Sequence, residues 1–346
     1  MKTLVTGGGG FLGRYIVEQL LARGNEVTVF ARGSYPELAQ LGARPLRGDL
    51  QDSEAVSRAC AGLDAVFHVA AKADIWGQWA AFYGANVTGT QHIIDACRRN
   101  GVPKLIYTST PSVVASGSSR AGADESLPYP ARFEAFYPHT KAIAEQLVRQ
   151  ASGPDLLTVS LRPHVVFGPR DTQIIPRLVA RARAGKLIRV GSGRNRLDVT
   201  YVEDAARAHL LAADALVPGA AVAGSVYFIS QDEPVNLWEF VNNLLARLDI
   251  PPVTRGISLP AARAIGGALE GLYRALRLPG EPRLTRFLAN ELALDHYYDI
   301  SAAKRDFGYR PQFTLAQAID KTVDYFRSLT PSSPQPPSPH GGEGGI

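Results

Sequence analysis

The chain has 346 residues, of which 45% are hydrophobic and 20% charged, and its formal net charge is +5. This composition is typical of a globular protein, and the length is sufficient for two lobes. The basic residues are scattered along the chain without forming a run, so we do not expect nucleic acid as a partner. Cys60 and Cys97 are too few for a disulfide framework, and the N-terminus has no secretory signal pattern. Both observations predict a cytoplasmic protein, and we predict no metal site.

A glycine-rich turn near the N-terminus is the first functional signal. Residues 2–6 (KTLVT) have the pattern of a buried strand, and the apolar residues of 11–21 recur at helical spacing. The glycines between them lack β-carbons, so a pyrophosphate can approach the backbone and the unpaired N–H groups of the helix. The spacing fits both G-x-G-x-x-G and G-x-x-G-x-x-G, and therefore selects no subfamily. We predict cofactor contacts from Gly7, Gly10, Phe11, Leu12 and Gly13.

The ends of the second and third predicted strands bear on which dinucleotide is bound. Residues 26–30 form the second strand, and Arg32 follows where an acidic residue would hold the adenosine 2′-hydroxyl. An arginine can pair with a 2′-phosphate, so NADP(H) is favoured over NAD(H), although Arg32 is otherwise an ordinary solvated loop charge. Asp49 and Leu50 follow the third strand, at 43–47. Asp49 either binds the adenine amino group or forms the turn.

Strands and helices continue to alternate along the first half of the chain. The fourth strand, at 65–69, runs into Ala70, Ala71 and Lys72, where small residues let the nicotinamide ribose pack closely. A helix from about Asn86 leads to the fifth strand, at 104–108. This alternation predicts an α/β fold with a Rossmann-type, doubly wound parallel sheet, whose ligands bind at the carboxyl ends of the strands.

A tyrosine and a lysine four residues apart carry the predicted chemistry. Tyr137 and Lys141 share one face of a predicted helix. An ammonium one turn away, together with an oxidised nicotinamide, is expected to lower the pKa of the tyrosine and to tune it for proton exchange with an alcohol or ketone oxygen. Hydroxyls near Thr110 supply a donor for that oxygen. Asn86 serves either as a helix N-cap or in a proton relay through water.

Several motifs together give the chain a family resemblance. They are TGGGGFLG, HVAAK, NVTGT, YTSTPSVV, YPHTK, LRPHVVFGP and DVTYVEDAARAHLLA. In this order the chain resembles the extended short-chain dehydrogenase/reductase (NAD-dependent epimerase/dehydratase) family over nearly its whole length. Within that family it resembles the 3β-hydroxysteroid dehydrogenase/isomerase-like branch and looks closest to the 2-alkyl-3-oxoalkanoate reductases of long-chain olefin synthesis.

The resemblance implies a role for each matching residue. Tyr137 becomes the proton donor or acceptor, Lys141 its partner and a ribose ligand, and Thr110 the hydroxyl beside the reacting oxygen. Pro163 and Val166, with the residues between them, would lie against the nicotinamide. Two departures matter: threonine replaces the usual serine at 110, and Val165 replaces an asparagine of the nucleotide-sugar members. The second departure counts against a sugar-nucleotide epimerase.

The remainder of the chain is predicted to form a smaller α/β substrate lobe. We predict a cofactor domain over 1–169, rejoined at about 198–230, and a substrate lobe over 170–197 and 231–328. Arg194 and Arg196 either pair with a substrate carboxylate or are solvated. The segment 258–280 has helical apolar spacing with interrupting charges, so it is a lid, a helix on a membrane surface or pathway enzyme, or part of the core. The Pro/Ser/Gly-rich tail at 329–346 is predicted to be disordered.

We therefore expect an NAD(P)H-dependent oxidoreductase that interconverts a ketone and a secondary alcohol. Its substrate is a hydrophobic small molecule, such as a 2-alkyl-3-oxoalkanoate (a β-keto acid) or a 3-keto or 3β-hydroxy steroid. The alternatives are a nucleotide-sugar epimerase or dehydratase and, more remotely, a non-catalytic sensor of NADP. We expect a homodimer.

Overall fold

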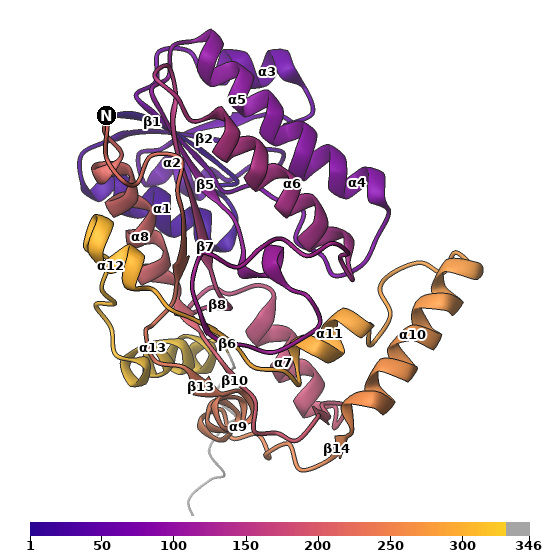
Figure 1. Ribbon diagram of the computed structural model, residues 1–346. Coiled ribbons are helices and arrows are strands. Elements are labelled where there is room, and N and C mark those ends of the chain that lie inside the picture. The colour runs from indigo at the N-terminus through magenta and orange to yellow at the C-terminus, as the bar shows by residue number, and fades with distance from the viewer. Residues whose placement is uncertain (330–346) are drawn as a thin grey trace, which may run out of the picture.

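The computed structural model describes residues 1–329 and is built on a seven-stranded parallel sheet (Figure 1). Its strand order is β12-β7-β5-β4-β1-β2-β3. The strands are β1 Lys2–Thr6, β2 Glu26–Ala31, β3 Arg44–Arg47, β4 Ala65–His68, β5 Lys104–Thr108, β7 Leu157–Pro163 and β12 Val226–Ile229. The predicted Rossmann-type fold is confirmed. The strand order reverses between β1 and β4, and ligands of such sheets bind in the crevice at that point.

Helices cover both faces of this sheet, as the buried apolar strands require. One face packs against α1 (Phe11–Ala22) and α8 (Val202–Ala215), and the other against α3 (Ser53–Ala59), α5 (Gly89–Arg99) and α6 (Phe136–Ala151). The short helix α2 (Pro36–Gln40) lies before β3. Asp52 caps α3 by accepting hydrogen bonds from the backbone N–H groups of Glu54 and Ala55.

The helix predicted from about Asn86 begins earlier than expected. It starts with α4 (Trp79–Tyr83), passes through a π-helical turn at Gly84–Thr88 and continues as α5. Asn86 lies inside the π turn and is not an N-cap. A π turn inside a longer helix re-aims side chains locally and often marks a functional site.

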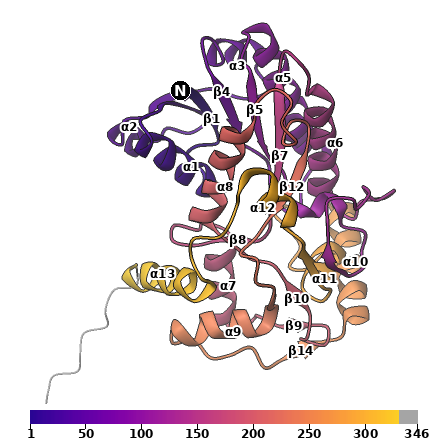
Figure 2. The same ribbon diagram turned by 60° about the vertical axis from the view of Figure 1, so that its left-hand side comes forward.

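The smaller lobe lies beyond the carboxyl ends of the large sheet (Figure 2). It contains a four-stranded sheet of order β13-β10-β15-β6. Its strands are β13 Val235–Asn236, β10 Arg196–Leu197, β15 His296–Tyr298 and β6 Arg120–Ala123. Strand β6 comes from the first half of the chain, so the two lobes exchange segments in the region before α6 as well as at 198–230.

Helices and short strands complete the smaller lobe and its connections. The pairs β8 (Val166–Phe167) with β11 (Thr200–Tyr201), and β9 (Arg189–Val190) with β14 (Gly256–Ile257), form two further small sheets. The helices are α7 Ile174–Arg183, α9 Leu237–Arg247, α10 Leu259–Ala275, α11 Arg286–Glu291, α12 Ser301–Phe307 and α13 Leu315–Ser328. The predicted tail falls almost entirely outside the described residues.

Candidate active site

The glycine-rich loop between β1 and α1 forms a cradle of bare backbone. Gly7 has φ of +69°, and a β-carbon there would lie 2.8 Å from the Cα of Ala70. A β-carbon at Gly13 would lie 2.2 Å from the carbonyl oxygen of Gly7. No side chain caps the N-terminus of α1, so its first N–H groups remain available for an anion. The loop therefore fits the pyrophosphate of a dinucleotide.

The loop opens into a cleft of about 820 Å³ along the carboxyl ends of the strands. Almost every residue predicted to bind cofactor or to act in catalysis lines it: Gly7, Gly10, Phe11, Leu12, Gly13, Arg32, Asp49, Leu50, Ala70, Ala71, Lys72, Thr110, Tyr137, Lys141, Pro163 and Val166. Asn86 is the exception. Tyr35, Asp171 and Ile174, which were not predicted, also line the cleft.

Tyr137 and Lys141 enter this cleft from the first two turns of α6. Pro138, with its fixed φ, is tolerated in the first turn of the helix. The Lys141 ammonium donates to the carbonyl oxygen of Thr108 at 2.6 Å and lies 4.1 Å from the centre of the Tyr107 ring. The lysine is thus fixed against the end of β5, beside the tyrosine that precedes it by one turn.

Burial dominates the electrostatics of the pair. It raises the pKa of Tyr137, whereas a hydrogen bond with Thr110 acts to lower it. The direction is opposite to the expected one, because desolvation of the buried phenolate outweighs that opposing contribution. Burial also lowers the pKa of Lys141 to about 7, and Glu145 partly opposes that shift.

The hydroxyl groups after β5 point in different directions. Thr108 shares a hydrogen bond of 2.8 Å with the buried His209, so its hydroxyl is engaged inside the fold. Thr110 is the N-cap of a short 3-10 turn, where its oxygen accepts from the N–H of Ser112 and lies 3.0 Å from that residue's hydroxyl. Thr110 lines the cleft together with Tyr137, and its hydroxyl acts to lower the pKa of that phenol.

Asn86 joins two segments of the chain through its side-chain amide. Its Oδ1 accepts the N–H of Lys72 at 2.7 Å, while its Nδ2 donates to the carbonyl of Lys72 and to Oγ1 of Thr140, each at 3.0 Å. The loop that carries Lys72 is therefore tied to the helix that carries Tyr137. At the adenosine end, Asp49 accepts the N–H of Gln51 at 3.0 Å, which is the turn interaction, while still lining the cleft.

Two groups of buried polar residues were not anticipated from the sequence. Glu145 on α6 and Arg162 on β7 form an ion pair through contacts of 2.6 and 2.9 Å, and Tyr129 donates to the same carboxylate. The only signal for Glu145 is its position four residues after Lys141 on the same helix face.

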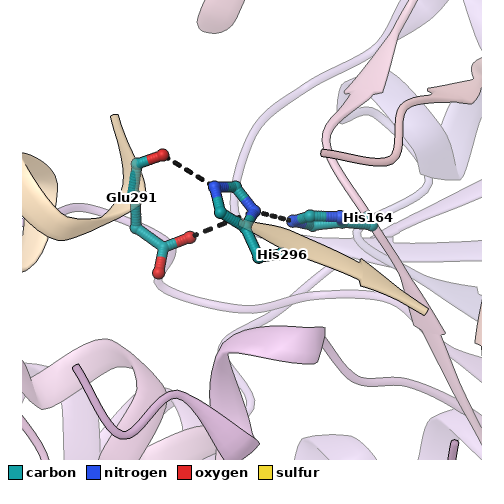
Figure 3. Close-up of side chains that lie close together, drawn as sticks. All are labelled: His164, Glu291 and His296. Carbon is teal, nitrogen blue, oxygen red and sulfur yellow. Dashed lines mark hydrogen bonds and ion pairs between the residues drawn. The ribbon is translucent and has the colours of Figure 1, made fainter. Parts of the chain in front are cut away.

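The second group brings together His164, which follows β7, and Glu291 and His296 of the smaller lobe (Figure 3). His296 Nε2 donates to the carbonyl of Glu291 at 2.7 Å, so its Nδ1 accepts from Nε2 of His164 at 3.1 Å when both rings are neutral. Arg120 binds the Glu291 carboxylate at 3.3 Å. Burial, together with His296 and the Arg120 guanidinium, holds the pKa of His164 well below its ordinary value. His164, Glu291 and His296 also lie close enough together to hold a metal ion, and a Glu291 carboxylate oxygen lies 3.9 Å from Nδ1 of His296.

A nicotinamide-dependent oxidoreductase of the extended short-chain dehydrogenase/reductase kind is the class of protein that this cleft defines. The sequence model of the 3-beta hydroxysteroid dehydrogenase/isomerase family matches residues 4–260. The chain belongs to that family, as the motifs predict.

Comparison with curated proteins and solved structures agrees with this assignment. The chain is 50% identical to a 2-alkyl-3-oxoalkanoate reductase of Stenotrophomonas maltophilia, over 92% of this chain and 97% of the relative. It is 36% identical to the decarboxylating sterol-4-alpha-carboxylate 3-dehydrogenase of Mus musculus, over 95% and 91% of the two chains. A solved dTDP-glucose 4,6-dehydratase from Streptomyces venezuelae with bound NAD has a TM-score of 0.75 at 25% identity, covering 94% and 97%. The protein is accordingly an NAD(P)-dependent dehydrogenase or reductase that acts on CH–OH groups.

Proposed function

We propose that the protein interconverts the ketone and secondary alcohol of a hydrophobic β-oxo or β-hydroxy carboxylic acid, and reduces a 2-alkyl-3-oxoalkanoate with NADPH. The observation that carries this proposal is the convergence of Thr110, Tyr137 and Lys141 in the cleft of the glycine-rich loop. The names of the two curated relatives add a chemical constraint. In both named substrates, the reacting carbon lies next to a carbon that bears a carboxylate.

Each residue of the pair has a defined task in this reaction. When bound along the glycine-rich loop, the nicotinamide supplies or accepts the hydride. Tyr137 gives a proton to the ketone oxygen, or takes it from the alcohol, and Thr110 donates a hydrogen bond to the same oxygen. Lys141, one helical turn after Tyr137 and held by the Thr108 carbonyl, carries the positive charge that we propose favours the phenolate.

A preference for NADP(H) rests on Arg32. This residue is exposed after β2, lines the adenosine end of the cleft, and has no carboxylate partner among residues 1–329. A guanidinium in that position can bind a 2′-phosphate through two hydrogen bonds. No acidic residue at the end of β2 is available to hold a 2′-hydroxyl instead.

The substrate carboxylate requires a cation near the reacting end of the cleft. The sequence offered Arg196 as a partner for this carboxylate, but its side chain is engaged elsewhere. Its guanidinium donates to the carbonyl of Pro234 and lies over the ring of Tyr297. Neither it nor Arg194 lines the cleft. Lys72 does, and its ion-pair partner is the largely exposed Asp74. We therefore assign the carboxylate to Lys72.

Steady-state consumption of NADPH tests the proposed function. Wild-type protein should oxidise NADPH with 2-alkyl-3-oxoalkanoates in preference to 3-ketosteroids lacking a carboxylate and to nucleotide sugars. Tyr137→Phe should abolish turnover and leave NADPH binding nearly intact. Turnover of nucleotide sugars without net NADPH consumption would instead support the epimerase or dehydratase function. Binding of NADP(H) with no turnover of any ketone or alcohol would support a sensor.

A further inference from the structure

One side of α10 exposes an unbroken row of apolar residues. The row comprises Ala261, Ala264, Ile265, Ala268, Leu272, Ala275 and Leu276, all exposed, and we call it the α10 stripe. The exposed fractions of Ile265, Leu272 and Leu276 are 46%, 47% and 62%. The spacing places all seven on one face over about four turns of helix. Leu278, 37% exposed, follows immediately beyond the helix.

The charged side chains of α10 lie on its inner side and edges. Glu270 is 2% exposed and accepts hydrogen bonds from the backbone N–H and guanidinium of Arg286. Arg263 donates to Asn290 and to the carbonyl of Gly117. A β-carbon at Gly266 would lie 2.7 Å from the backbone of Thr285, so the helix approaches the start of α11 closely. The helix is thus docked through the side that carries these polar residues and the buried Ala262, and the stripe is not part of the core.

Exposed arginines follow the C-terminal end of the stripe in sequence. Arg277, between Leu276 and Leu278, and Arg283 are both exposed, whereas Arg274 lies on the Glu270 side of the helix, 3.9 Å from that carboxylate. The exposed acidic residue in the same region, Glu281, pairs with Arg177. The local surface therefore combines an apolar face with a surplus of positive charge.

We propose that α10 lies in the interface of an anionic membrane, with the stripe among the acyl chains and the arginines at the headgroups. An apolar face bordered by basic residues is the pattern of interfacial helices. The stripe contains only Ala, Ile and Leu, whereas the energetic hot spots of protein interfaces are enriched in Trp, Tyr and Arg. None of the helices within residues 1–329 is long and apolar enough to cross a membrane.

The same helix adjoins the rim of the cleft. Tyr273 packs edge-on against Trp76, with ring centres 6.3 Å apart, and Arg274 lies over the same indole. Trp76 belongs to the loop that carries Lys72 and Asp74, both of which line the cleft. If the proposed function holds, a substrate with two alkyl chains can pass from the bilayer to the cleft along this side. Membrane binding itself does not depend on that function.

Co-sedimentation of the full chain with vesicles tests the proposal. Wild-type protein should bind vesicles containing phosphatidylglycerol more tightly than phosphatidylcholine alone, and added salt should weaken the binding. The double variant Leu272→Gln/Leu276→Gln should bind about tenfold or more weakly, because two inserted side chains are lost. A matched variant, Leu41→Gln/Val217→Gln, changes two apolar residues that are each 46% exposed elsewhere and should bind like wild type.

The outcomes distinguish binding of the stripe to a membrane from its binding to a second copy of the chain. Turnover of a soluble short-chain ketone should be unchanged in both double variants, which shows that they are folded. Equal binding of wild type and the stripe variant, or no preference for anionic vesicles, would overturn the proposal. The proposal would also be overturned if the wild-type protein does not bind vesicles but self-associates through the stripe, as measured by sedimentation velocity. None of these readouts depends on the identity of the natural substrate.

Discussion

Glu145 lies one helical turn beyond Lys141 and is itself bound by Arg162 through contacts of 2.6 and 2.9 Å. The Glu145 side chain is fully buried and that of Arg162 is 2% exposed. Burial alone would drive Lys141 towards its neutral form, and the Glu145 carboxylate opposes this shift. Arg162 in turn keeps the pKa of Glu145 below its ordinary value. The ion pair thereby helps to maintain the charge on Lys141.

Replacing Glu145 by glutamine should move the pH profile of the enzyme. Without the Glu145 carboxylate, nothing on that side offsets the effect of burial, and the pKa of Lys141 falls further. The activity that needs the Lys141 ammonium is therefore lost at a lower pH. We expect the alkaline limb of kcat/KM to shift by about one unit towards lower pH. The control is Tyr129→Phe, which removes a neutral hydrogen bond to the same carboxylate. An unshifted limb in Glu145→Gln would contradict the assignment.

The role of the Thr110 hydroxyl can be tested with one variant that keeps the hydroxyl and one that keeps only the shape of the side chain. Thr110→Ser keeps the hydroxyl and should retain most of the activity, whereas Thr110→Val should lower kcat by about 10²-fold, as loss of one oxyanion donor does. Steady-state kinetics with the same ketone measures both variants, and NADPH affinity should change in neither. Comparable activity of the valine and serine variants would show that another group holds the reacting oxygen.

Local sequence patterns anticipated the large sheet and most of the cleft, but long-range pairings escaped them. The glycine loop and the Tyr137–Lys141 pair are short-range motifs that their spacing reveals, and the rule that ligands bind at the carboxyl ends of parallel strands predicted that they share a site. The contact between His164 and His296 joins residues 132 positions apart, and β6 enters the smaller lobe by pairing with β15. Hydrophobic periodicity reports local secondary structure and gives no sign of such long-range pairings. The orientation of Arg196 also depends on tertiary packing, which its place in a glycine-rich segment could not reveal.

The buried His164 should make stability depend on pH. Burial holds the pKa of His164 well below the ordinary 6.5, so the unfolded chain binds a proton there that the folded protein does not. Stability is fully present above pH 6.5 and falls as the pH decreases, by about 1.4 kcal/mol per pH unit for this group. His164→Gln, which can still donate to His296, should reduce that slope. Urea unfolding between pH 7 and 5 measures it, and identical slopes would refute the interpretation.

Val165 stores backbone strain at the wall of the cleft. Its φ is +39°, a conformation that asparagine tolerates far better than a β-branched residue. Val165→Asn should therefore stabilise the fold by about 1 kcal/mol. It should also lower kcat/KM for a hydrophobic ketone, because an amide then faces the alkyl chain. Val165→Gly relieves the strain without an amide and separates the two effects in thermal unfolding and kinetic assays. An asparagine variant less stable than wild type would contradict the strain argument.

Lys72 offers the most direct test of the substrate class. Asn86 ties the backbone of Lys72 to Thr140, which lies three residues after Tyr137 on α6. Assays in the oxidative direction avoid the spontaneous decarboxylation of β-keto acids. They compare a 2-alkyl-3-hydroxyalkanoate with the matched secondary alcohol that lacks the carboxylate. Lys72→Met should lower kcat/KM for the acid by about 10- to 100-fold, the range for loss of a charged hydrogen bond. It should leave turnover of the neutral alcohol and the affinity for NADP⁺ nearly unchanged, and Lys72→Arg should restore part of the loss.

Asp74→Asn serves as the control: it frees the Lys72 ammonium and should not weaken use of the acid. Equal losses for both alcohols, or a weakened NADP⁺ affinity, would assign Lys72 to the cofactor and leave the substrate carboxylate without its proposed partner.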